Sequence, residues 1–142
     1  MSREVLVAAK CVAQRVLGPE WVLPLFQEYL SSRYGCPPDR VVFDYKDACR
    51  RIREAVYLGH TETTERADEI NGETDGDTIW LMRRLGDGLL LNTLLHEALH
   101  DSVFVERATR SGLRRTLSES DEHAIMEIVG SICGSTREHR CQ

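Results

Sequence analysis

The sequence predicts a single domain of the α+β class, in which helices accompany a small three-stranded sheet. The chain has 142 residues, of which 42% are hydrophobic and 29% charged, so it can bury one core but not two. Stretches with the apolar spacing of helices alternate with short runs of β-branched and aromatic residues. We expect the domain to span residues 1–134, with a flexible tail at 135–142.

The N-terminal part of the chain predicts two helices. Residues 3–17 form the first, which ends at Gly18. The second has Pro19 or Pro24 in its first turn, because proline lacks only an N–H group that the first turn leaves unbonded. Gly35 then breaks the chain.

Three short runs have the composition of strands, and they lie at 40–45, 55–58 and 78–82. The segment 47–54 is compatible with either a helix or a loop. A polar segment before the third run contains Asn71-Gly72 and Asp75-Gly76, both of which are typical of turns.

The apolar segment 89–105 predicts a helix, with Asp87 expected at its N-cap. Leucine side chains cover nearly every side of this helix, which is typical of a buried one. Its centre reads His96-Glu97-Ala98-Leu99-His100. Two histidines and a glutamate are costly to bury without partners, and a metal ion would supply that partner.

The spacing of these residues matches a zinc site. Residues four apart lie on the same face of a helix, so His96 and His100 can reach one ion. Glu97 is rotated to the side, where it can address a water on the metal. The alternative without a metal is that the histidines are hydrogen-bonded core residues of a small interaction module.

A catalytic zinc site has three protein ligands and one open position. The last predicted helix begins at Ser118 or Ser120 and carries Glu122 on its apolar face. Glu122 is the preferred third ligand, because an unpaired carboxylate on that face would be costly. Glu119, one turn earlier, and His123 remain alternatives. A carboxylate near a helix N-terminus is also favoured by the helix dipole alone.

These segments resemble the zincin metallopeptidases, and within them the small gluzincins. The matching segments are 93–100 (TLLHEALH) and, more weakly, 121–124 (DEHA). The predicted order of elements is also similar: helices, three strands, motif helix, ligand helix. One departure is Asp101, where zincins usually have an uncharged residue.

The resemblance implies a Zn²⁺-dependent hydrolase that acts on peptide or protein substrates. The zinc ligands would be His96, His100 and Glu122. Glu97 would be the general base that takes a proton from the attacking water. The strand at 78–82 would form the edge of the cleft, where an extended peptide pairs. A zincin-like protein that binds zinc without hydrolysis is the non-catalytic alternative.

A more distant resemblance is to SprT-like zincins, which act on DNA-bound proteins. Its basis is a cluster of arginines between the two ligand-bearing helices: Arg107, Arg110, Arg114 and Arg115. The net charge of -5 argues against general nucleic-acid binding. Charged clusters in loops are usually solvated, so a DNA-associated protease that binds nucleic acid through these arginines is the less favoured alternative function.

Cysteine usage favours a cytoplasmic location. The five cysteines are odd in number and show no C-x-x-C pairing, which is typical of reduced thiols rather than a disulfide framework. No stretch reaches the length of a transmembrane helix, so no membrane partner is expected.

Overall fold

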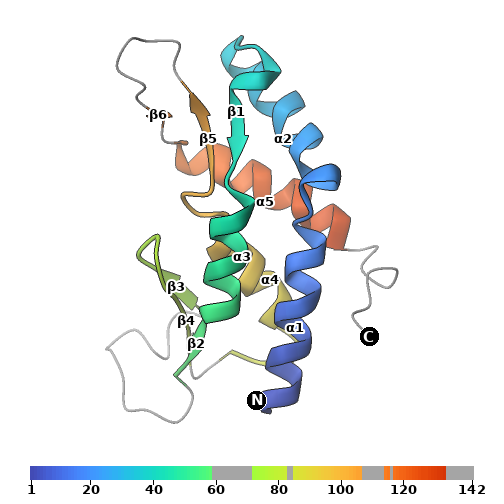
Figure 1. The fold of residues 1–142 in the computed structure, drawn as a ribbon, viewed down its shortest axis with the longest axis vertical. Coiled ribbons are helices and arrows are strands. Elements are labelled where there is room, and N and C mark those ends of the chain that lie inside the picture. Colours follow the sequence, from blue (N-terminus) through green and yellow to red (C-terminus); the bar gives the residue numbers. More distant parts are fainter. Residues whose placement is uncertain (59–71, 83–84, 107–113, 116, 134–142) are drawn as a thin grey trace.

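Five helices and two small sheets make up the described part of the chain, and the fold is α+β as predicted (Figure 1). The structure is a computed structural model that describes residues 1–58, 72–82, 85–106, 114–115 and 117–133; of 114–115 and 130–133 it describes only the backbone. The helices are α1 (Arg3–Val16), α2 (Pro19–Tyr34), α3 (Tyr45–Glu54), α4 (Asp87–Leu99) and α5 (Glu119–Cys133). The strands are β1 (Val41–Phe43), β2 (Val56–Tyr57), β3 (Gly72–Thr74), β4 (Ile79–Leu81), β5 (Val103–Glu106) and β6 (Arg114–Arg115).

The first two helices begin and end where the sequence predicts. The Ser2 hydroxyl caps α1 by accepting a hydrogen bond from the N–H of Val5 at 3.2 Å. Pro19 is the first residue of α2. Gly35 ends that helix with φ 65°, a left-handed conformation that glycine adopts at little cost.

The segment that the sequence left open between helix and loop is α3. The carboxylate of Asp44 caps it, accepting a hydrogen bond from the N–H of Asp47 at 3.2 Å. One face of α3 is buried, and it includes Ala48 and Ile52. A capped segment with a buried face forms a helix although its composition is polar.

The strands form two three-stranded sheets, where the sequence predicted one. Strand order is β1-β5-β6 in the first sheet and β2-β4-β3 in the second. In the first sheet β1 and β5 are antiparallel, with Val41 opposite Val105 and Phe43 opposite Val103. In the second, β4 is parallel to β2 and antiparallel to β3.

The helix predicted over 89–105 is shorter than expected, and this prediction is wrong beyond Leu99. Helix α4 ends there, and Asp101 has φ 65°, which turns the chain away from the helix axis. The apolar residues that follow form β5, because β-branched side chains pair well with β1. At the other end Gly86 is the N-cap, and Asp87 is the first helical residue instead of the cap.

The strand predicted to form the edge of a cleft is not an edge. Strand β4 lies between β2 and β3, so both of its sides are already hydrogen-bonded. Strand β3 was not predicted, because its polar residues are typical of a loop. Strand β3 is an edge of this sheet, and it is the strand that packs on α4 next to Glu97.

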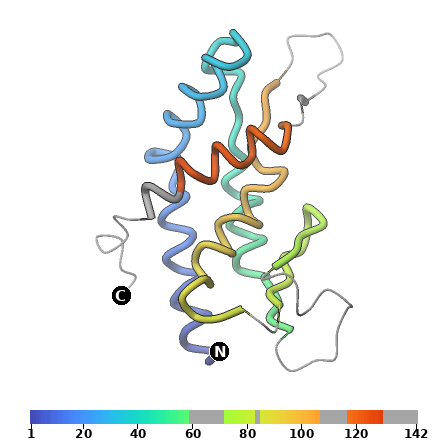
Figure 2. The backbone as a smooth tube through the Cα atoms, turned by 180° about the vertical axis from the view of Figure 1, so that it is seen from behind, coloured from blue at the N-terminus to red at the C-terminus, as the bar shows by residue number. Residues whose placement is uncertain are grey.

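Helix α4 lies at the centre of the molecule. It contacts α1, α3, α5, β3 and β4, and most of its side chains are buried, as predicted. Figure 2 shows α5 crossing the molecule on the side opposite to that seen in Figure 1. The central position of α4 means that neighbouring elements enclose both histidines and the glutamate of the motif.

The expectation about cysteines is wrong for Cys11, which is disulfide-bonded. Cys36 and Cys49 are free thiols, as expected. A disulfide removes the main support for a reducing compartment, so the cytoplasmic location stays a prediction. No helix within the described ranges combines the length and apolar character that crossing a membrane requires.

Gly72 brings β3 so close to α4 that a methyl group does not fit between them. A Cβ at this position would lie 2.7 Å from Cγ2 of Thr93 and 3.4 Å from Cγ of Glu97. We expect Gly72→Ala to lower the free energy of unfolding by about 1–3 kcal/mol in urea titrations, because overpacking displaces the strand.

Thr93→Ser tests the cause of that loss. It removes Cγ2 but keeps the hydroxyl, which donates to the carbonyl of Leu89 at 2.8 Å. A double-mutant cycle is expected to show that Gly72→Ala costs much less in the Thr93→Ser background. Gly88→Ala is the control: no neighbour lies within 4 Å of its Cβ, and alanine favours helix by about 1 kcal/mol. An equal cost of Gly72→Ala in both backgrounds would contradict the close approach.

Candidate metal centre

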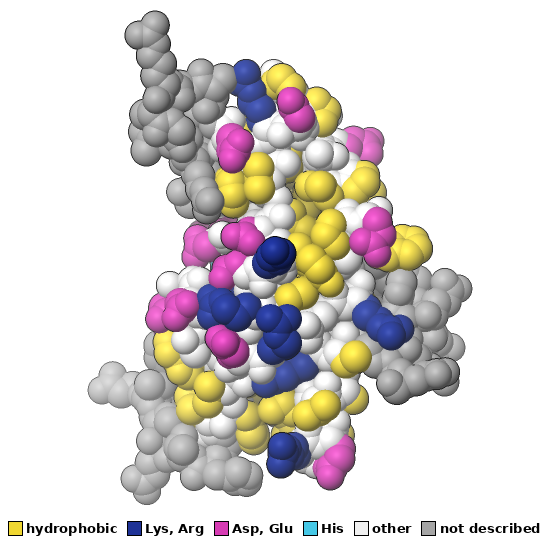
Figure 3. Space-filling model, in the orientation of Figure 1, with side chains coloured by type: hydrophobic (Ala, Val, Ile, Leu, Met, Phe, Trp, Pro, Cys, Tyr) yellow, Lys and Arg dark blue, Asp and Glu magenta, His cyan; other side chains and the backbone are white. Residues whose placement is uncertain are grey.

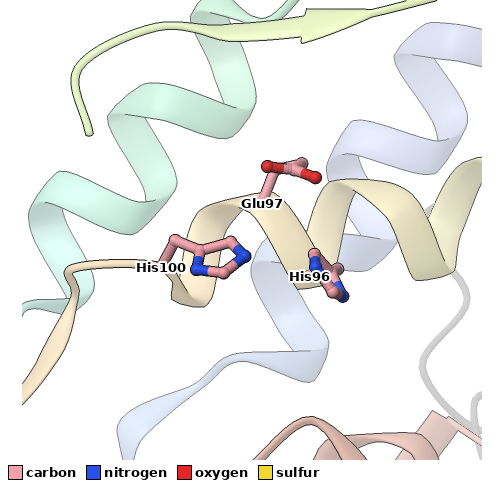
Figure 4. Close-up of side chains that lie close together, drawn as sticks. All are labelled: His96, Glu97 and His100. Atoms are coloured by element: carbon pink, nitrogen blue, oxygen red, sulfur yellow. The ribbon is translucent and has the colours of Figure 1, made fainter. Parts of the chain in front are cut away.

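His96, Glu97 and His100 converge at the C-terminal end of α4. Their possible ligand atoms all lie within 4.8 Å of one another. Glu97 is buried, with 7% of its surface exposed, and both histidines are half-buried. Figure 4 shows the two imidazoles neighbouring each other along the helix, with Glu97 rising from it towards the strand above. The structure therefore brings together the three residues of the predicted motif.

His100 keeps its place on the helix surface although it follows the last helical residue. Its φ of -58° is helical, so its Cβ points as it would within the helix. Its ψ of 126° redirects only the chain that follows. The two rings are 4.9 Å apart between centroids and inclined by 68°. The spacing argument for His96 and His100 thus survives the early end of α4.

Arg51 of α3 holds this end of the helix. Its side chain is completely buried. Its guanidinium donates hydrogen bonds to three main-chain carbonyls of the motif, those of Glu97 (3.2 Å), Ala98 (2.7 Å) and His100 (2.8 Å). It also donates to the hydroxyl of Ser102, and its Nε lies 3.1 Å from a carboxylate oxygen of Asp47.

Arg51 is not among the predicted site residues, although the sequence carries a signal for it. Ala48, Arg51 and Ile52 lie at i, i+3 and i+4, which places the arginine on the apolar face of α3. A cation on an apolar face needs buried acceptors, and the end of a neighbouring helix offers them.

Glu122 approaches the cluster from α5. One of its carboxylate oxygens lies 2.9 Å from Nδ1 of His100, and the Nδ1–H group donates to it. Nε2 is then the nitrogen of His100 left for an ion, and Figure 4 shows a ring nitrogen directed towards His96. A carboxylate that holds the second nitrogen of a ligating histidine fixes its tautomer and orientation. The role of third metal ligand stays a prediction for Glu122.

The two alternatives to Glu122 are less well placed. Glu119 and His123 are both exposed on α5. The charge of His123 nevertheless helps to lower the pKa of His96.

A buried carboxylate fixes the start of α5 and thereby Glu122. Asp121 is fully buried and accepts hydrogen bonds from Tyr29 at 3.1 Å, from Ser118 at 3.0 Å and from Tyr34. Nε of Arg33 lies 2.6 Å from the same carboxylate. Burial alone would raise the pKa of Asp121, but these hydrogen bonds and the arginine charge lower it on balance.

This network anchors α5 to α2. The predicted cap at Ser118 is confirmed, because its hydroxyl accepts a hydrogen bond from the N–H of Asp121 at 3.2 Å. The tyrosines that complete the network lie 92 and 87 residues away from Asp121, so no local pattern marks them.

Burial shifts the titration of two residues of the motif. It lowers the pKa of His96, and the charges of His100 and His123 lower it further. It raises the pKa of Glu97, an effect that His100 opposes and Glu73 reinforces. A neutral imidazole is the form that binds metal, and a carboxylate with a raised pKa is the better proton acceptor.

The residues present fit a zinc ion in their chemistry. Zinc takes imidazole and carboxylate ligands at about 2.0–2.2 Å, usually in a tetrahedron. Two imidazoles with carboxylates on both sides form such a set. Tetrahedral bonds of that length separate the donor atoms by about 3.4 Å, so binding would draw the side chains somewhat closer than they lie here.

The structure does not describe the side chains of the arginines behind the SprT-like resemblance. Arg107 and Arg110 lie outside the described residues. Arg114 and Arg115 form β6, and their side chains also lie outside the description. The predicted tail at 135–142 is likewise not described.

A face away from the cluster carries mixed charge. Arg50 of α3, for example, lies within 2.9 Å of carboxylate oxygens of Asp47, Glu54 and Asp77. Figure 3 shows Lys and Arg side chains gathered among Asp and Glu on one face, and no described histidine is visible there.

Comparison with protein-family models, with curated proteins and with solved structures finds no match to this chain. Its function is therefore inferred from the residues of the site.

Glu122 is expected to support zinc binding. Glu122→Ala should raise the Kd for zinc about 10–100-fold, measured by competition with a chromophoric chelator, because His100 loses the partner that orients it. Glu127→Ala is the control, since it removes an exposed carboxylate from the same helix that has no expected role at the site. Unchanged affinity in Glu122→Ala would contradict any role for this residue.

Glu122→Gln separates the two roles of the carboxylate. The amide oxygen can still accept the hydrogen bond from Nδ1 of His100, so an orienting role predicts an affinity close to that of the wild type. A neutral amide is a poor zinc ligand. Direct ligation therefore predicts a loss as large as that of Glu122→Ala.

Proposed function

We propose that this chain is a zinc-dependent metallopeptidase of the zincin type, similar to the small gluzincins. His96 and His100 bind the ion, Glu97 is the general base, and Glu122 supports the site from α5. The observation that carries this proposal is the convergence of two half-buried imidazoles and a buried carboxylate within 4.8 Å at the end of one helix. A structural zinc site needs no general base and usually has four protein ligands.

Each residue has a task that its surroundings favour. His96 is kept neutral by burial, so its ring nitrogen is available to the ion. His100 is oriented by Glu122 at Nδ1 and offers Nε2. A bound zinc ion would supply the chemistry that the side chains lack, by lowering the pKa of water and polarising the carbonyl of the substrate.

Glu97 moves the proton. Its carboxylate accepts a proton from the attacking water and delivers it to the nitrogen of the leaving amine. Burial raises the pKa of Glu97, which strengthens it as an acceptor in the first step. The short distance between β3 and α4 at Gly72 keeps this side chain against the sheet and limits the space for water around it.

The substrate class is a peptide or protein segment in extended conformation. Strand β3 is an edge of the second sheet and packs beside Glu97. An extended segment can add to such an edge through main-chain hydrogen bonds, which do not depend on its side chains. The strand on which we expect the substrate to dock is therefore 72–74 instead of 78–82.

Glu97→Gln tests the proposal most simply. The substitution keeps the size of the side chain and removes the base, so zinc content should stay at the wild-type level. The rate of hydrolysis of an unfolded protein such as reduced casein should fall about 10²–10⁴-fold. The release of new amino groups measures this rate. His96→Ala should lose zinc as well as hydrolysis.

Glu127→Gln is the matched control, because it neutralises an exposed carboxylate outside the cluster. It should hydrolyse casein at the wild-type rate. Equal rates for Glu97→Gln and the zinc-loaded wild type would refute the role of Glu97. If the wild-type protein binds zinc but does not hydrolyse casein, the non-catalytic alternative is favoured.

A further inference from the structure

We propose that Arg51 is the positioning residue of this centre: its guanidinium fixes the main chain of His100 and so the place of the second imidazole. The inference rests on the proposed function, since it concerns the same site. Arg51 acts from α3 through main-chain atoms at the end of α4, and it donates to the carbonyls of three residues of the motif, Glu97, Ala98 and His100.

The end of α4 needs donors that the helix cannot provide. An α-helix leaves its last four carbonyl groups without intrahelical partners. The carbonyl of Leu99 accepts from the N–H of Ser102 at 3.2 Å. Arg51 satisfies the carbonyls on either side of it, at Ala98 and His100, and also that of Glu97. The guanidinium thus supplies the N–H donors that a further turn of helix would otherwise provide.

His100 depends most on this replacement. Within a longer helix the following turn would hold its carbonyl, but here the chain turns away at Asp101 with φ 65°. Residues other than glycine are uncommon in that conformation and adopt it at a cost. The hydrogen bond from Arg51 to the His100 carbonyl, at 2.8 Å, offsets this cost and holds the residue at the helix end.

An arginine suits this place better than any other residue. Carbonyls at a helix C-terminus carry partial negative charge, which favours a cation. The planar guanidinium presents five N–H groups in a fixed fork, whereas a lysine ammonium is a compact charge whose three donors radiate from one atom. Asp47 supplies the opposite charge at Nε, 3.1 Å away, so the buried cation is paired.

Arg51→Lys is the test, with Co²⁺ as the probe because its visible spectrum reports ligand geometry. The substitution keeps the charge and loses the fork. We expect the Kd for Co²⁺ to rise at least about tenfold, and the spectrum of the bound ion to change because His100 shifts. The spectrum separates positioning from a general loss of stability, since it comes only from folded, metal-loaded protein.

Arg50→Lys is the matched control. Arg50 is the neighbour of Arg51 on α3 and also pairs with Asp47, at 2.8 Å. Its other partners are Glu54 and Asp77, which lie outside α4. Affinity and spectrum should match the wild type.

If Arg51→Lys does not fold, Ser102→Ala serves as the test variant instead. The Ser102 hydroxyl accepts from Arg51 and donates to the carbonyl of Ala98, so its removal loosens the same cap without removing a charge. A weaker Kd and an altered spectrum are expected again. Wild-type affinity and spectrum in the folded variant would overturn the positioning role and leave the proposed function standing. A wild-type protein that binds neither Co²⁺ nor Zn²⁺ would overturn the proposed function itself.

Discussion

The buried guanidinium of Arg51 and the last carbonyls of α4 satisfy each other, and the candidate site depends on that contact. A cation without acceptors is costly in a protein interior, and so are carbonyls without donors. Here the guanidinium supplies the donors and the carbonyls supply the acceptors, so neither group is buried without a partner. The contact also permits α4 to end at Leu99 without exposing its end to water, and it leaves His100 on the same face as His96. A motif that usually stands inside a helix is thereby completed by a tertiary contact.

A second buried charge, on Asp121, holds α5 in place. Asp121 binds α2 side chains through its carboxylate and so fixes the helix turn that carries Glu122. Glu122 then reaches Nδ1 of His100. The site is thus held from two directions, by α3 through the main chain of His100 and by α5 through its ring. Positioning from independent elements gives a metal centre the rigidity that ligand geometry requires.

Local signals in the sequence predicted what depends on local physics. The placement of proline and glycine located α1 and α2, and the motif placed His96 and His100 on one face. Ser118, one of two expected caps, marked the start of α5. The residues after Leu99 read as helix because an apolar run does not distinguish a buried helix from a strand; pairing with β1 decides it. Strand β3 pairs with the nearby β4 across the predicted turn at Asp75-Gly76, but its polar residues do not distinguish a strand from a loop. The positions of Arg51 and of the tyrosines around Asp121 depend on partners far away in the chain.

The central claim is that one zinc ion binds between His96 and His100, and anomalous diffraction tests it most directly. Crystals grown with zinc would be measured above and below the zinc absorption edge. The account predicts one anomalous peak per chain, about 2.1 Å from Nε2 of both histidines, with Glu122 beside it. The absence of an anomalous peak at this place, with zinc held by other residues or not at all, would contradict the account.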